Sequence, residues 1–191
     1  MSAIATRLAR FMALLGGAVL LALIAVTCLS VLGRGLNTFG HSAFLSELFP
    51  ALGEALLATG VAPVTGDFEL VEAGIAFAIF AFLPICQLKG GHATVDILSD
   101  QFPGRVNRFL IVFWEVAFTL IVLLIAWRLF EGFQGKLRNG ETTFLLQFPI
   151  WWAYGASFGA AVIASLIALF VAISRVVALV SGRSPLAIGG N

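Results

Sequence analysis

Four long apolar intervals, each almost free of charged residues, constrain this chain more than any other feature of its sequence. They cover about residues 11–33, 68–88, 109–127 and 150–174. A helix rises about 1.5 Å per residue, so roughly 20 apolar residues cross the hydrocarbon core of a bilayer. None of the intervals alternates with a period of two residues, as a transmembrane β-strand would. The sequence therefore predicts an all-α integral membrane protein with four transmembrane helices.

The composition excludes several other classes of protein. Hydrophobic residues make up 60% of the chain and charged residues only 11%, whereas soluble domains carry about a quarter charged residues. Lys and Arg (11) nearly balance Asp and Glu (10), which disfavours a nucleic-acid binder. Two Cys and two His are too few for a disulfide framework or an obvious metal site. A soluble enzyme and a disordered chain are likewise disfavoured, and no cofactor is expected.

The basic residues predict that both termini lie in the cytoplasm. In that orientation the cytoplasmic segments hold seven of the eleven: Arg7, Arg10, Lys89, Arg105, Arg108, Arg175 and Arg183. The opposite side holds Arg34, Arg128, Lys136 and Arg138. Cytoplasmic loops carry the excess of Lys and Arg in membrane proteins. The first apolar interval is longer than the core of a usual signal peptide, so cleavage after it is not expected.

Two segments between the spans have the pattern of short amphipathic helices. Residues 41–59 place apolar side chains at helical spacing with Glu47 and Glu54 off that face, which fits either a helix in the outer membrane interface or a linker helix packed on the protein. Pro50 would start a second short helix there or kink a single one. Residues 92–102 have the same pattern on the cytoplasmic side, and the helix after Trp127 is expected to continue to a turn at Asn139-Gly140.

Few polar residues are candidates for chemistry. Glu115 is the one acid well inside a span, and ionisable residues inside a membrane are functional candidates by default. It lies about two turns from Arg108, near the inner boundary, so ion coupling, snorkelling and contact with a partner protein all stay open. His92 and Asp96 are four residues apart, but that spacing alone fits a histidine bonded to a loop carbonyl and an aspartate facing solvent.

The fourth span carries a stripe of small residues. Gly155 and Gly159 are four apart, and alanines recur every four residues at Ala156, Ala160, Ala164, Ala168 and Ala172. Small residues at this spacing let another helix approach closely in lipid. The approaching helix could belong to a large partner or to this chain itself. Trp151, Trp152 and Tyr154 begin the same span, as an aromatic belt at the outer interface would.

In order along the chain, these features resemble one membrane-protein family. The stretch GHATVDILSDQFPGRVNR follows the second span and contains His92 and Asp96, and NGETTFLLQFPIWWAYG enters the fourth. The latter includes Thr143, Leu145, Pro149, Trp151 and Tyr154. From residue 11 to residue 175 the chain resembles the small, DctQ-like membrane subunit of tripartite ATP-independent periplasmic (TRAP) transporters. The segment 35–66 is longer than that family's pattern leads us to expect.

The resemblance implies partners and a location. It implies a large multi-helix membrane subunit that holds the substrate and sodium sites, and a periplasmic solute-binding protein that delivers a substrate, commonly an organic acid. Both would meet this chain at the bacterial inner membrane, among membrane lipids. An accessory subunit of a respiratory or photosynthetic complex is the main alternative, and a membrane enzyme is a second one for which the polar inventory is thin.

Overall fold

The computed structural model describes residues 3–42, 47, 50–89 and 104–181. They form the helices α1 (Ala3–Gly40), α3 (Pro50–Ala58), α4 (Asp67–Lys89), α6 (Gly104–Asn139) and α7 (Ile150–Val180). All but α3 are long and apolar enough to cross a membrane, and the described residues contain no strand beyond one isolated bridge. The prediction of an all-α membrane protein with four transmembrane helices is therefore confirmed.

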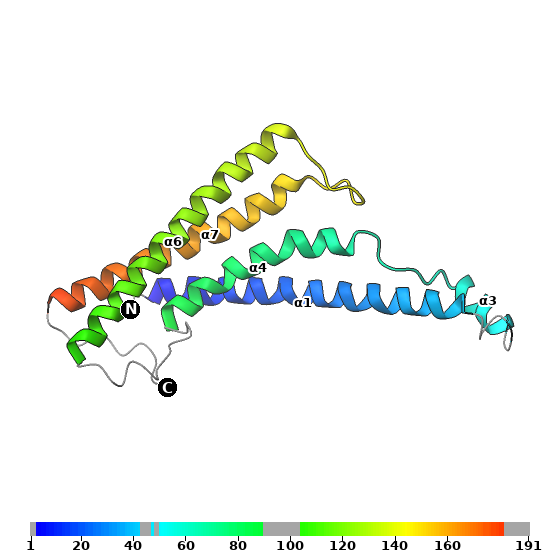
Figure 1. Cartoon of the computed structure of the whole chain (residues 1–191), viewed down its shortest axis with the longest axis horizontal. Coiled ribbons are helices and arrows are strands. Elements are labelled where there is room, and N and C mark those ends of the chain that lie inside the picture. Colours follow the sequence, from blue (N-terminus) through cyan, green and yellow to red (C-terminus); the bar gives the residue numbers. More distant parts are fainter. Residues whose placement is uncertain (1–2, 43–46, 48–49, 90–103, 182–191) are drawn as a thin grey trace.

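The four long helices are arranged as two antiparallel hairpins, α1 with α4 and α6 with α7 (Figure 1). The hairpins meet through α4 and α7 at the end where α1 begins and α7 ends, which we call the joined end. They diverge toward the other end, which we call the turn end because it carries the turn between α6 and α7 (Figure 1). Two clusters of buried side chains near the joined end form the core, one around Ala9, Leu88, Ile167 and Val171 and one around Met12, Ala81 and Ala160.

Glycines bring α1 close to its neighbours. A Cβ atom added at Gly16 would lie 2.8 Å from the Cβ of Ala81 on α4. Farther along α1, a Cβ at Gly33 would lie 2.3 Å from the carbonyl oxygen of Ala62, in the segment that leads back to α4. The absence of a side chain at these two positions allows a contact too close for any larger residue.

Aromatic rings and glycines interlock α6 with α7. The ring of Phe133 on α6 stacks on Phe158, with centroids 6.4 Å apart and an interplanar angle of 11°. A Cβ at Gly155 would come within 3.1 Å of the Phe133 ring, and a Cβ at Gly132 within 2.8 Å of the Tyr154 ring. Each glycine therefore makes room for an aromatic ring of the other helix.

The helices continue past the apolar intervals that predict the spans. The helix α1 has 38 residues, or about 57 Å at 1.5 Å per residue, roughly twice the hydrocarbon thickness. The helix α6 ends at Asn139, and Gly140 follows with a left-handed φ of 64°, where the sequence predicts the turn. Charge-free runs mark the part of a helix that suits lipid, while the helix itself ends only where the backbone must turn. Pro50 is the first residue of α3, and the predicted segment 92–102 lies outside the described residues.

Two glycines one turn apart on α6 test the packing with α7. We expect Gly132→Leu to destabilise the protein by about 1–3 kcal/mol, because the added atoms overpack the Tyr154 contact. Gly135→Leu is the matched control, since a Cβ there meets no atom within 4 Å. Thermal unfolding in detergent measures both variants. Equal loss of stability in the two would contradict the packing described here.

Candidate functional site: a buried polar network and a clamped turn

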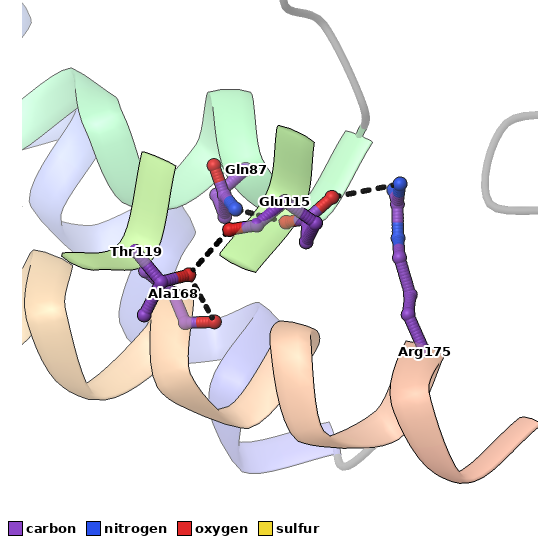
Figure 2. A network of polar contacts seen from close by, with 5 residues as sticks. All are labelled: Gln87, Glu115, Thr119, Ala168 and Arg175. Carbon is purple, nitrogen blue, oxygen red and sulfur yellow. Dashed lines mark hydrogen bonds and ion pairs between the residues drawn. The ribbon is translucent and has the colours of Figure 1, made fainter. Parts of the chain in front are cut away.

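Glu115 lies at the centre of a polar network that joins three helices at the joined end (Figure 2). One carboxylate oxygen of Glu115 on α6 accepts a hydrogen bond from the amide of Gln87 on α4. The other is 2.7 Å from the guanidinium of Arg175 on α7. Glu115 and Gln87 are buried, and the side chain of Arg175 is only 17% exposed. The network therefore bonds one hairpin directly to the other.

Thr119 adds a second contact between α6 and α7. One turn beyond Glu115, its hydroxyl donates to the Glu115 carbonyl oxygen at 2.8 Å, and it lies 3.4 Å from the Ala168 carbonyl oxygen (Figure 2). A hydroxyl bonded to the carbonyl four residues back is satisfied within its own helix. Thr119 therefore brings no unpaired polar group into the interface.

The charges in this network neutralise each other. An isolated carboxylate in an apolar environment costs several kcal/mol of lost hydration, which only a well-placed cation and additional hydrogen bonds offset. Arg175 supplies the cation and Gln87 supplies a further donor. Among the described residues the other buried charged side chain, Asp67, also has an arginine nearby, with Arg34 3.8 Å away. Each buried acidic residue among those the structure describes therefore has an arginine of the same chain nearby.

A second polar contact joins the hairpins at the turn end. Glu69, in the first turn of α4, accepts hydrogen bonds from the backbone N–H groups of Leu145 (2.7 Å) and Leu146 (2.9 Å) with its two carboxylate oxygens. The side chain of Leu146 also fills the space beside Gly66, where a Cβ would meet it at 2.5 Å. Glu69 therefore holds the α6–α7 turn against the start of α4, and we call this contact the clamp.

The turn itself is closed by its own hydrogen bonds. The N–H of Thr143 donates to the carbonyl of Phe148 (2.9 Å), and the N–H of Ile150 donates to the carbonyl of Glu141 (3.0 Å). Gln147 adopts a left-handed φ of 54°. At the base of the turn Lys136 pairs with Glu141, and this ammonium holds the pKa of the Glu141 carboxyl below its ordinary value, aided by a hydrogen bond from Asn139.

The motif residues around the fourth span build this turn and the α6–α7 contact. Thr143 and Leu145 make the backbone hydrogen bonds described above, and Pro149 directly precedes α7 in an extended conformation (φ −64°, ψ 116°). Trp151 packs edge-on against Phe133, and Tyr154 covers Gly132. The motif residues around the fourth span therefore largely make contacts within the chain.

The structure divides the predicted small-residue stripe between two environments. Ala160, Ala164, Ala168 and Ala172 are buried within the chain, as packing among the chain's own helices requires. Gly159 and Ala156 are exposed, and no atom lies within 4 Å of a Cβ placed on Gly159. Gly155 contacts Phe133 of α6. Only the part of the stripe near the turn end is thus open to another molecule.

The sequence singles out Glu115 as a candidate but not its partners, and it singles out no role for Glu69. Gln87 and Arg175 end two apolar runs near the boundary that Glu115 also approaches, so the sequence indicates a similar depth for the three residues but not that their helices are neighbours. The sequence does not indicate the partners of Glu69, because these are backbone N–H groups, which every residue type except proline carries. His92 and Asp96 lie outside the described residues, and their role stays a prediction.

The described residues form no group of three or more His, Cys, Asp or Glu that could hold a metal ion. Their polar network can lock helices together and offers no arrangement of nucleophile and base. Fold and site together define a multi-pass membrane protein in which the buried charged side chains of the described residues pair with other residues of the same chain.

A comparison with known protein families identifies the family within this class. Residues 23–182 match the family described as "Tripartite ATP-independent periplasmic transporters, DctQ component". The match covers most of the sequence, so the chain belongs to the DctQ family and is a small membrane component of a TRAP transporter. Searches of curated proteins and of solved structures gave no significant match.

A double-mutant cycle tests the polar network. We expect Glu115→Leu to destabilise the protein by about 3 kcal/mol, because it leaves the largely buried Arg175 without its counter-ion. Adding Arg175→Met should recover a substantial part of the loss, since no unpaired charge remains. Equilibrium unfolding in mixed micelles measures each variant. Removing the exposed Arg128–Glu131 pair is the control and should change little. Additive effects of Glu115→Leu and Arg175→Met would contradict the pairing.

Hydrogen exchange tests the clamp. We expect Glu69→Ala to accelerate amide exchange at Leu145 and Leu146, because both N–H groups lose their acceptor. Glu72→Ala is the matched control one turn away, since Glu72 is exposed and makes no ion pair among the described residues. Unchanged exchange at Leu145 and Leu146 in the Glu69 variant would show that the clamp does not protect the turn.

Proposed function

We propose that this subunit is a non-catalytic brace for the large membrane subunit of its transporter. In this proposal the large subunit carries sodium coupling and substrate translocation, and the brace also helps to dock the periplasmic solute-binding protein for uptake of an organic acid. The main support is that the buried carboxylates pair with arginines of the same chain. Glu115 and Asp67 both have arginine partners within the chain, which argues against a role for these carboxylates in binding a solute.

The exposed apolar surface supports contact with a membrane partner. Along α1 the buried positions hold Met12 and otherwise only small residues, whereas the exposed positions hold large apolar side chains, among them Leu14, Leu21, Leu29 and Leu32. Two folded hairpins with such a surface can lie along another helical protein without first becoming ordered, which lowers the entropic cost of association. The open Gly159 offers a further point of close helix approach.

Reconstitution tests the brace. We expect the large subunit purified with this chain to unfold at a higher temperature than the large subunit alone, because binding to the folded state stabilises it. Vesicles that contain only this chain should take up no labelled organic acid, with or without a sodium gradient. Substrate-dependent uptake by this chain alone would refute the proposal, and so would failure of the two subunits to co-purify.

We further propose that both termini lie in the cytoplasm, so that the turn end faces the periplasm. Support comes from the distribution of Lys and Arg. A membrane-impermeant thiol reagent added from the periplasmic side should label a cysteine replacing Asn139, which lies at the turn between α6 and α7, and should not label one replacing Ser2. The native thiols Cys28 and Cys86 would be replaced by Ala in both variants. The reverse labelling pattern would overturn the orientation.

A further inference from the structure

The α6–α7 turn belongs to a charge-free stretch that is too long for a single membrane crossing. Residues 142–174 contain no Asp, Glu, Lys, Arg or His. About 20 helical residues suffice to cross the hydrocarbon core, so the turn and the start of α7 are free of charge without being needed for the crossing. The charged residue that directly precedes this stretch is Glu141, at the base of the turn on the α6 side, and it pairs with Lys136.

The tip of this turn exposes large apolar side chains. Phe144 is 87% exposed, Leu145 55% and Trp152, in the first turn of α7, 57%. In Figure 1 the turn leaves the end of α6 and reaches toward the start of α4, where Glu69 holds it. The apolar tip therefore has a fixed position at the level of the first turn of α4.

Five backbone N–H groups of the turn have hydrogen-bond partners inside the protein. The N–H groups of residues 143, 145, 146, 148 and 150 donate to the Phe148 carbonyl, to Glu69, to the Thr143 hydroxyl and to the Glu141 carbonyl. Non-helical backbone is tolerated near lipid only where such groups are satisfied by protein or by water in a cavity. These internal partners let the turn enter a region where water is scarce.

We propose that Phe144, Leu145 and Trp152 form an interfacial anchor that inserts among the lipid headgroups of the leaflet at the turn end. Aromatic side chains favour this depth because their rings suit the boundary between headgroups and acyl chains. The tip is continuous with the apolar surface of α7, with no charged residue between them, so lipid that surrounds the span also reaches the tip. The anchor fixes the height of the α6–α7 hairpin in the bilayer, and it does not depend on the brace proposed above.

Spin-label accessibility tests the anchor. A nitroxide on Phe144→Cys would be measured in lipid nanodiscs, with Cys28 and Cys86 replaced by Ala, both for this chain alone and for its complex with a cysteine-free large subunit. Leu145→Cys gives a second position if the first variant does not fold. Reference labels replace Leu124, which is exposed in the middle of α6, and Asn139, which is exposed at its end.

For each label we take the ratio of its collision rate with oxygen to its collision rate with a water-soluble nickel chelate. We expect this ratio to be several-fold higher at position 144 than at Asn139. Its oxygen-to-nickel ratio should lie between those of Asn139 and Leu124, and should be the same with and without the large subunit. A ratio equal to that of Asn139 would place the tip in water and overturn the proposal. Loss of both collision rates on assembly would also overturn it, because the large subunit would then cover the tip.

Discussion

A carboxylate buried among apolar helices must have a counter-ion and hydrogen-bond donors, and the arrangement of this protein depends on how Glu115 meets that requirement. Gln87 and Arg175 come from the two helices through which the hairpins meet, so satisfying one side chain fixes α4, α6 and α7 relative to one another. Buried ion pairs often add little net stability, because desolvation offsets much of their attraction. The network here favours one register: sliding α7 by one turn would separate the charges of Glu115 and Arg175, and sliding α4 by one turn would remove the Gln87 donor.

Glu69, which is only partly buried, connects the hairpins at the opposite end through backbone groups. Its two oxygens bind two consecutive backbone N–H groups of the α6–α7 turn, so this turn connects the hairpins at the end toward which their helices diverge (Figure 1). These two contacts favour one arrangement of the hairpins. That property suits the small component of a TRAP transporter, the family to which residues 23–182 assign the chain.

The predictable part of this fold is the part that depends on lipid. Four apolar intervals gave the number and type of the helices because the bilayer demands long runs without charge, and Asn139-Gly140 gave the turn because glycine accepts a left-handed φ. The partners of Glu115 depend on which helices become neighbours, and an apolar run carries no record of that. The stripe on α7 shows the same limit: its spacing predicts close packing, but the burial of Ala160 inside the chain depends on the position of Ala81 on α4.

The angle between the hairpins is the most direct measure of this account. Paired nitroxide labels at Leu36 on α1 and Leu137 on α6, both exposed, would report it by pulsed electron resonance in nanodiscs. The account predicts one narrow distance distribution for the native chain and a broad one when Glu115→Leu and Glu69→Ala are combined. A broad distribution in the native chain, or an equally narrow one in the double variant, would show that these two carboxylates do not hold the hairpins together.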